Sequence, residues 1–208
     1  SVTDFSGRAI RFEYDAHGDL ISVTNPAGQT VRYTYSSGYP DDREELNHNL
    51  LTATDAKGQT YLKNKYSIYD RVTKQTFGDE GTFIIEYNQV ASSLECTPDL
   101  IDKTFYRTRV SDRMGNKSDY SFNCQGNVLQ LVRHTRGVRP EDPKQYATKY
   151  TYNKDGLMTK QTNPGGDATE YEYDAKGNVT KQIRSPATGS SDAPLATAWR
   201  ATARSPAR

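Results

Sequence analysis

The sequence predicts an all-β fold: an antiparallel meander of tandem β-hairpins that forms a curved sheet strip. One pattern recurs along the 208 residues. Its best copies run from Tyr14 to Tyr35 and from Tyr152 to Tyr173, with the bounding tyrosines 21 residues apart in both. Between the turns, apolar and polar residues alternate with the period of two that is typical of a half-buried strand. Each turn is followed by roughly six or seven strand residues, which predicts roughly ten to twelve strands.

The strand pattern is clearest where Ile10, Phe12 and Tyr14 alternate with Arg11 and Glu13. The same three places recur, with polar residues between them except at Ile84, as Val31-Tyr33-Tyr35, Phe83-Ile85-Tyr87, Thr148-Tyr150-Tyr152 and Thr169-Tyr171-Tyr173. We expect the aromatic positions of the repeat to line one face of the sheet: Phe12, Tyr14, Tyr33, Tyr35, Tyr66, Tyr87, Phe122, Tyr150, Tyr152, Tyr171 and Tyr173.

The turns combine Asp or Asn at the first place with Gly at the fourth. In the turn from Asn25 to Gly28, Pro26 suits the second place of a type I turn, and Gly28 takes the left-handed conformation that closes a short hairpin. The side chain at the first place can bond the backbone two residues on. We assign a structural turn role to Asp4, Gly7, Asp15, Gly18, Asn25, Gly28, Asp55, Gly58, Asp112, Gly115, Asn123, Gly126, Asn153, Gly156, Asn163, Gly166, Asp174 and Gly177.

One copy of the pattern, from Tyr66 to Tyr87, has decayed. Asp70 stands where the first glycine is expected, and Gly81 is displaced by one residue. Asp tolerates left-handed backbone better than most residues, so we expect the turn at Asp70 to persist.

Three polar segments interrupt the repeat array, which we expect to span residues 1–184. They lie near 36–50, 88–103 and 136–146, and we interpret them as longer loops on one rim, where repeat arrays usually carry insertions. Residues 185–208 have no period and are rich in Ala, Ser, Pro and Arg, which indicates a flexible tail. The alternative for this tail is a stretch that is not native sequence, for instance a shifted reading frame.

Composition and charge exclude several classes of function. The formal net charge is +1, which points neither to nucleic acid nor to an anionic membrane. No run approaches the roughly 18 apolar residues of a membrane span. The two cysteines, Cys96 and Cys124, can pair in a secreted context, and their spacing leaves that open. With three scattered histidines they form no zinc pattern, so we expect no metal and no cofactor.

The beginning of the chain shows neither an initiator Met nor a signal peptide. It opens in mid-pattern at Ser1, which suggests a piece cut from something longer. A sheet strip with two unpaired edges is expected to be marginally stable or prone to aggregate alone.

The unit Tyr-Asp/Asn-x-x-Gly-x-Leu/Val, followed by Asn/Asp-x-x-Gly and Tyr-x-Tyr, resembles the YD repeat of RHS proteins. The best copies are Tyr14-Asp15-Ala-His-Gly18-Asp-Leu20, Tyr152-Asn153-Lys-Asp-Gly156-Leu157 and Tyr173-Asp174-Ala-Lys-Gly177-Asn178-Val179. The resemblance covers residues 1 to about 184, apart from the three loops.

RHS and YD-repeat proteins are large, secreted or surface-associated, and include bacterial polymorphic toxins, insecticidal toxin-complex subunits and teneurins. The resemblance implies a structural, non-enzymatic segment of a secreted or cell-surface protein, part of a larger hollow β-shell that encloses a toxin or other C-terminal domain. The implied partners are neighbouring repeats of the same parent protein and the enclosed domain, with no nucleic acid and no direct membrane insertion. The family's autocleavage motif has an Asp-Pro-x-Gly core, which Asp142-Pro143-Lys-Gln lacks, so we assign no catalytic residue.

The alternative function is a carbohydrate- or receptor-binding adhesion module whose partners are cell-surface glycans. Aromatic faces stack on sugars, but tyrosines at repeat-fixed strand positions are more often cross-strand pairs, worth about 0.2–1 kcal/mol each. The acidic run Asp41-Asp42-Arg43-Glu44-Glu45 could hold calcium or paired catalytic carboxylates. We expect a solvated loop there, because no partner residues with defined spacing accompany the run.

Overall fold

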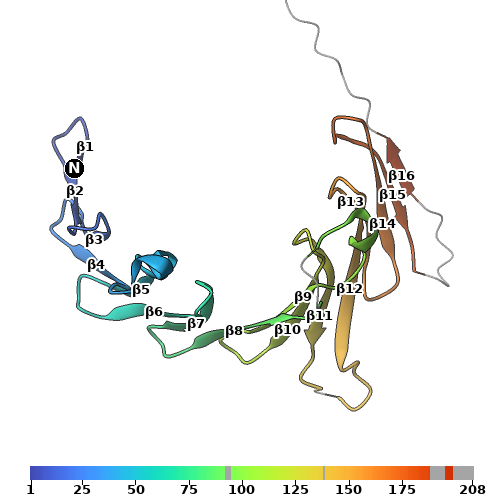
Figure 1. The fold of residues 1–208 in the computed structure, drawn as a ribbon, viewed down its shortest axis with the longest axis horizontal. Helices are drawn as coiled ribbons and strands as arrows, with labels where there is room; N and C mark the ends of the chain where they lie inside the picture. The colour runs from blue at the N-terminus through green and yellow to red at the C-terminus, as the bar shows by residue number, and fades with distance from the viewer. Residues whose placement is uncertain (92–94, 138, 188–194, 199–208) are drawn as a thin grey trace, which may run out of the picture. The chain divides into compact units, whose positions relative to one another are not determined.

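The structure is a computed structural model that describes residues 1–91, 95–137, 139–187 and 195–198 (Figure 1). The chain forms two compact units, residues 1–86 with 110–115 and residues 87–109 with 116–208. In the described residues, all regular structure is β-strand apart from two short 3-10 helices.

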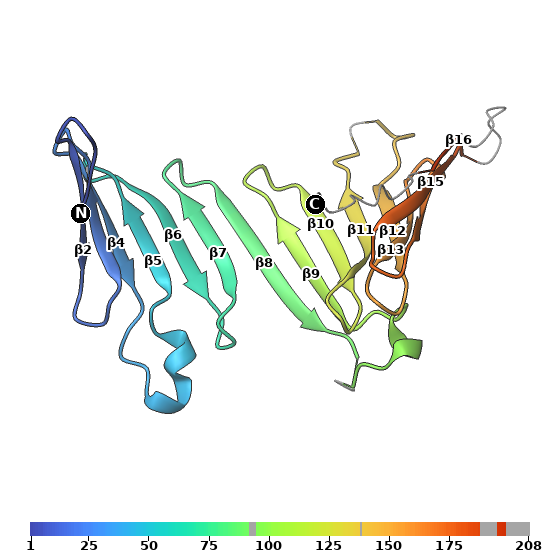
Figure 2. The same ribbon diagram turned by 90° about the horizontal axis from the view of Figure 1, so that it is seen from above.

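The first unit is an antiparallel meander whose strands are hydrogen-bonded in chain order. Figure 2 shows β5, β6 and β7 side by side in that order. The strands are β1 (Val2–Thr3), β2 (Ala9–Tyr14), β3 (Leu20–Thr24), β4 (Thr30–Tyr35), β5 (Leu50–Thr54), β6 (Thr60–Tyr66), β7 (Val72–Phe77) and β8 (Thr82–Gln89), whose end from Tyr87 belongs to the second unit. The segment between β4 and β5 contains a 3-10 helix, η1 (Asp41–Leu46).

The second unit continues the same plan, and β10 to β16 pair antiparallel in chain order. Its elements are η2 (Pro98–Leu100), β9 (Tyr106–Ser111), β10 (Lys117–Phe122), β11 (Val128–His134), β12 (Gln145–Tyr152), β13 (Met158–Thr162), β14 (Ala168–Tyr173), β15 (Val179–Ser185) and β16 (Leu195–Ala198). The end of β9, from Val110, belongs to the first unit.

A β-bulge recurs at the same place in the repeat. Between β2 and β3, Glu13 pairs with Ser22 and Tyr14 with Leu20, so one extra residue, Ile21, lies opposite Tyr14. The same shift precedes the aromatic residue that ends five other strands: Tyr35, Tyr66, Phe122, Tyr152 and Tyr173. A bulge increases the local twist and leaves a residue outside the hydrogen-bonded ladder.

Side chains divide between an aromatic face and a polar face. On β4, Val31, Tyr33 and Tyr35 are half-buried, whereas Arg32 and Thr34 between them are exposed. We call the face with Tyr33 and Tyr35, and its counterpart with Tyr150 and Tyr152 in the second unit, the aromatic face. In the described part of the chain the only buried hydrophobic residues are Leu46, Ala53, Phe105, Leu131 and Ala168. With so little core, turns and cross-strand contacts carry the fold.

The predicted number of strands is wrong, and one strand lies in a segment for which the sequence predicts no regular structure. The described residues form sixteen strands, not ten to twelve, because short strands such as β1 lack the aromatic pattern. The expected tail from residue 185 contains a strand, β16, in which Thr197 pairs with Gln182 of β15. Backbone pairing needs no aromatic period, so composition alone misses it. Residues 188–194 and 199–208 of that tail lie outside the described residues.

Candidate functional site: turns, tyrosine locks and two anchored loops

The turn Asp and Asn side chains close the hairpins by accepting backbone hydrogen bonds. Asn25 Oδ1 accepts from the N–H groups of Ala27 and Gln29, both at 3.0 Å. The same two bonds, from the second and fourth residues onward, are made by Asp4, Asp15, Asp55, Asn123, Asn153 and Asp174. The bond from the Asp19 N–H is the main cause that lowers the pKa of Asp15. These side chains are therefore engaged within their own turns.

Two other turns vary the pattern. Asp112 Oδ1 accepts a bond from the N–H of Met114. Asn163 instead donates from Nδ2 to Asp167 at 2.6 Å and accepts from Gln161 at 2.8 Å. The Asp112 bond to Met114 and the two Asn163 bonds thus each lie within one hairpin.

The fourth place of each turn has left-handed backbone. Gly28 has φ 80° and donates its N–H to the Asn25 carbonyl at 2.9 Å. The same positive φ is found at Gly7, Gly18, Gly58, Gly115, Gly126, Gly156, Gly166 and Gly177. In the decayed copy the place is held by Asp70 (φ 55°) and by Glu80 (φ 61°). Glu80 donates to the Phe77 carbonyl as Gly28 does to Asn25, which explains why Gly81 is one residue out of step.

The tyrosine that ends a repeat strand locks the bulge of the previous strand pair. Tyr35 at the end of β4 donates its hydroxyl to the carbonyl of Leu20, the first residue of β3, at 3.0 Å. Three further tyrosines repeat this geometry at 2.6–3.0 Å, namely Tyr66 to Leu50, Tyr152 to Val128 and Tyr173 to Met158. Each accepting carbonyl lies at a bulge, where the ladder leaves backbone groups in need of a partner.

The hydrogen bond of this tyrosine lock explains why the repeat has tyrosine, and not phenylalanine, at the end of these strands. A phenol fills the half-buried face with its ring and satisfies the bulge carbonyl with its hydroxyl, which Phe cannot do. Burial raises the pKa of Tyr35, Tyr152 and Tyr173, so the hydroxyls remain protonated donors at neutral pH.

Most other aromatic positions of the repeat are half-buried on the aromatic face: Phe12, Tyr33, Phe122, Tyr150 and Tyr171. Phe122 stacks on Tyr120, with ring centroids 6.2 Å apart. Tyr14 differs, because its side chain is 60% exposed and its hydroxyl makes no hydrogen bond within the described ranges. Tyr87, 37% exposed, is the other exposed member.

A hollow of about 550 Å³ lies where the segment between β4 and β5 meets the β2–β3 turn. Its lining combines aromatic side chains with acidic and amide groups, including Tyr33, Tyr35, Tyr39, Asp15 and Asn47. The acidic run that the sequence analysis expected to be a solvated loop folds as η1, and Asp41, Asp42, Glu44 and Glu45 are exposed there.

His48 ties this segment to the sheet. Its Nδ1 lies 2.9 Å from Asp19 Oδ2 and its Nε2 lies 3.4 Å from Glu44 Oε1. The Asp19 hydrogen bond is the main cause that raises the pKa of His48. His48 also has φ 65°, a conformation that costs free energy in a residue other than glycine. The contact between segment and sheet is therefore strongest when His48 is protonated.

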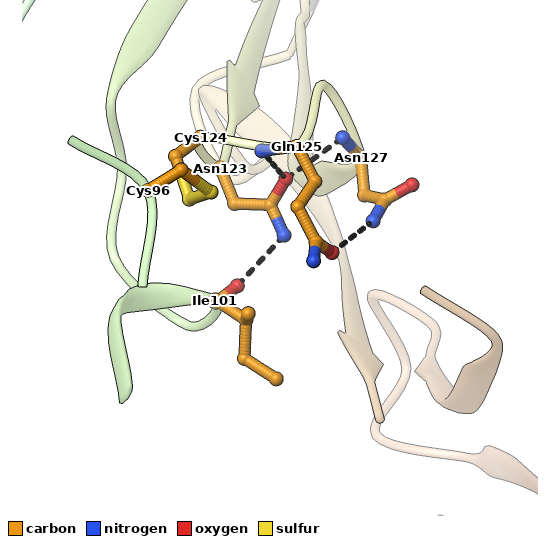
Figure 3. The surroundings of a disulfide bond; sticks show 6 residues. All are labelled: Cys96, Ile101, Asn123, Cys124, Gln125 and Asn127. Atoms are coloured by element: carbon orange, nitrogen blue, oxygen red, sulfur yellow. Dashed lines mark hydrogen bonds between the residues drawn. A yellow bond between two sulfur atoms is a disulfide. The ribbon is translucent and has the colours of Figure 1, made fainter. Parts of the chain in front are cut away.

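The second anchored loop lies in the second unit and is held by a disulfide (Figure 3). Cys96 and Cys124 are bonded, with their Cα atoms 5.3 Å apart and a sequence separation of 28. Beside the disulfide, the fully buried Asn123 donates from Nδ2 to the Ile101 carbonyl at 2.8 Å, while its Oδ1 closes the β10–β11 turn (Figure 3). One turn residue therefore also fixes the loop between β8 and β9.

A charged cluster crosses β9, β10 and β11. Arg109 holds Asp119 with two hydrogen bonds of 2.7 and 2.9 Å, and His134 Nε2 lies 2.8 Å from the same carboxylate. Arg109 is the main cause that lowers the pKa of Asp119 to about 2. The carboxylate is saturated by fixed partners, so the cluster is suited to cross-strand stabilisation and not to proton transfer.

Sequence reasoning missed three of these features. The tyrosine acceptors depend on strand register, and their sequence separation varies from 15 to 24 residues. The second bond of Asn123 and the two contacts of His48 depend on how the loops fold back.

Within residues 1–91, 95–137, 139–187 and 195–198, no cluster of three or more His, Cys, Asp or Glu is arranged to hold a metal ion. The same residues contain no helix long and apolar enough to cross a membrane.

Comparisons with known proteins match this architecture. The RHS Repeat family matches residues 1–30, 14–39 and 142–190. The crystal structure of TcdB2-TccC3-Cdc42 superposes with a TM-score of 0.60 at 16% sequence identity, covering 91% of this chain and 10% of that chain. The Tc holotoxin pore of Photorhabdus luminescens gives a TM-score of 0.59 at 16% identity, covering 91% of this chain and 9% of that one.

A third structure, TcdB2-TccC3 without its hypervariable C-terminal region, gives a TM-score of 0.60 at 16% identity, with 91% of this chain and 9% of that chain covered. The chain thus spans about a tenth of the length of the solved chains that it resembles, and the likeness is one of fold. No curated protein sequence matches the chain.

Proposed function

The chain carries RHS repeats in residues 1–39 and 142–190, and we propose a function from this premise. The chain is a non-enzymatic segment of the wall of a longer β-shell. That shell encloses a toxin or another C-terminal domain. The likeness in fold to TcdB2-TccC3 supports this proposal. The disulfide between Cys96 and Cys124 favours an oxidising, extracellular location, at the cell surface or in a secreted protein.

The tyrosine lock is the observation that carries the proposal. Tyr35, Tyr66, Tyr152 and Tyr173 use their hydroxyls to hold the preceding strand pair. The tyrosine hydroxyls of the repeat thus form hydrogen bonds that hold neighbouring hairpins together. An array built this way gains stability from each added repeat, as a wall requires.

Limited proteolysis of the longer polypeptide tests the wall function. With the wall intact, the C-terminal domain resists trypsin. Removing two locks with Tyr152→Ala and Tyr173→Ala loosens neighbouring hairpins and exposes that domain to cleavage. Tyr14→Ala is the matched control, because Tyr14 is exposed. Equal cleavage rates in all three proteins would contradict the proposal.

A second candidate is glycan binding, which the hollow beside η1 favours. Tyr33 and Tyr39 line it together with Asn47 and Asp15, a mixture of aromatic faces and polar groups suited to a sugar ring. Titration with a glycan panel tests it. Binding that Tyr39→Ala removes without changing the melting temperature supports this function, and a panel with no binder rejects it.

A further inference from the structure

We propose that three lysines on the polar face of the first unit, Lys63, Lys65 and Lys74, form a docking site for an extended acidic segment of polypeptide. The site goes beyond the wall function, because it assigns a partner to a face that the tyrosine locks do not use.

Strand register brings the three lysines together. Lys65 of β6 is directly opposite Lys74 of β7, and Lys63 is opposite Thr76. Residues directly opposite have Cβ atoms about 4.5–5.5 Å apart, and residues two apart on a strand are about 6.6 Å apart. Lys63 and Lys65 are exposed, while Lys74 is half-buried. Three ammonium groups thus share one small area of sheet.

The described residues offer these three lysines no counterion. In the part of the chain that the structure describes, no ion pair or hydrogen bond involves the ammonium groups of Lys63, Lys65 and Lys74. Their cross-strand neighbours are Thr52, Thr76 and Ile84. Glu86 lies two residues beyond Ile84 on β8 and forms no ion pair with them.

The polar face of the second unit shows the ordinary arrangement. There, Lys160 pairs with Glu170 across β13 and β14 at 2.7 Å, and Lys181 pairs with Glu172 across β14 and β15 at 2.9 Å. Like charges directly opposite each other destabilise a sheet, whereas opposite charges stabilise it. A like-charge pair that breaks this local rule without a compensating contact marks a place where function outweighs stability.

An extended acidic polypeptide fits the spacing and chemistry of the cluster. Carboxylates at alternate positions of an extended segment repeat about every 6.6 Å, the separation of Lys63 and Lys65. The cluster holds no arginine, whose planar fork gives bidentate contacts to phosphate. The chain as a whole carries a formal charge of only +1, a weak field for a polyphosphate backbone. Charge complementarity therefore favours protein over nucleic acid.

Fluorescence anisotropy with the full 208-residue chain tests the site. The probe is a fluorescein-labelled peptide of alternating Glu and Ser at low ionic strength. Lys65→Gln and Lys74→Gln each weaken binding by about threefold, as expected for an exposed ion pair, and the triple Gln variant removes it. The matched control, Lys160→Gln with Lys181→Gln, binds as the parent does because those lysines already have partners.

Thermal unfolding without peptide separates docking from misfolding. Lys65→Gln removes the repulsion and raises the melting temperature by about 1–2 °C while peptide binding falls. Lys160→Gln breaks an ion pair and gives no increase. The proposal is overturned if the peptide does not bind, if a labelled DNA oligonucleotide binds as tightly and is equally sensitive to Lys65→Gln, or if Lys65→Gln lowers the melting temperature together with binding.

Discussion

The two units of the chain share the same turn and the same tyrosine lock. They differ in the further contacts that stabilise each sheet. In the second unit a disulfide, the buried Asn123 and cross-strand ion pairs reinforce the sheet. In the first unit lie all three non-glycine residues with left-handed backbone in the described residues, His48, Asp70 and Glu80. The first unit also contains Lys63, Lys65 and Lys74 of β6 and β7, which form no ion pair with any described residue.

This difference shows which parts of the repeat are essential. The lock is common to both units, with Tyr35 and Tyr66 in one and Tyr152 and Tyr173 in the other. The additions vary: the disulfide and the His48 contacts hold the inserted segments, whereas the pair of Lys160 and Glu170 lies in a well-preserved copy of the repeat. The loop after β8 is bonded covalently to the β10–β11 turn, whereas the segment after β4 is held by His48 and leaves a hollow. Among the described residues, the disulfide and the cross-strand lysine–glutamate pairs belong to the second unit, whereas the first unit has an ion pair between Arg113 and Asp79.

Removing the disulfide should cause the largest change in stability of the substitutions considered, and that change should be confined to the second unit. Replacing Cys96 and Cys124 by Ser removes a cross-link across a sequence separation of 28 and should lower the free energy of unfolding by about 3–4 kcal/mol. Urea denaturation measures the loss, and hydrogen exchange should confine the increased opening to the second unit. Dithiothreitol should reproduce the effect in the parent and have no effect on the double variant. A loss spread equally over both units would contradict the comparison.

Restoring glycine in the decayed copy should strengthen the first unit. Left-handed backbone costs a residue with a Cβ atom about 1–2 kcal/mol, and the greater freedom of glycine in the unfolded chain offsets part of the gain. Glu80→Gly should therefore raise the free energy of unfolding by about 0.5–1 kcal/mol. The reciprocal control, Gly28→Ala, should destabilise by a similar amount. If Glu80→Gly is destabilising, Glu80 does more than hold the turn.

Acid should weaken the reinforcement of the second unit at Asp119. The folded pKa of Asp119 is about 2, below its ordinary value of 3.8. A depressed pKa gives stability that is present above the unfolded value and is lost as pH falls through the folded one. In urea titrations, the gap between the parent and Asp119→Asn should thus be fully present at pH about 4 and shrink towards pH about 2. A gap that does not change between those pH values would show that the cluster contributes nothing through its charge.

The fold class could be predicted from the sequence because the interactions that form the turns are local. Asp15, Asn25 and Asp174 lie at fixed distances before glycine, and Asx bonds and left-handed backbone operate within five residues. The alternation of Tyr33 and Tyr35 with polar residues likewise depends on strand period alone. These signals predict an antiparallel meander without any knowledge of which strands meet.

Features that depend on strand register could not be predicted from the sequence. The pairing of Lys65 with Lys74 and the reach of Tyr152 to Val128 follow from bulges that shift each strand by one residue. The link between Cys96 and Cys124 depends on the path of the loop after β8, which has no repeat to predict it. Strand β16 was missed because backbone pairing needs no aromatic period.

The most direct test of this account compares one tyrosine lock from each unit. Tyr35→Phe and Tyr173→Phe each remove a hydroxyl that bonds a bulge carbonyl, and both should lower the free energy of unfolding by about 1 kcal/mol in urea denaturation. Tyr14→Phe, which alters an exposed side chain, should change it by less than about 0.5 kcal/mol. If neither lock variant is destabilised, or if Tyr14→Phe costs as much as they do, the repeat tyrosines do not hold the wall together.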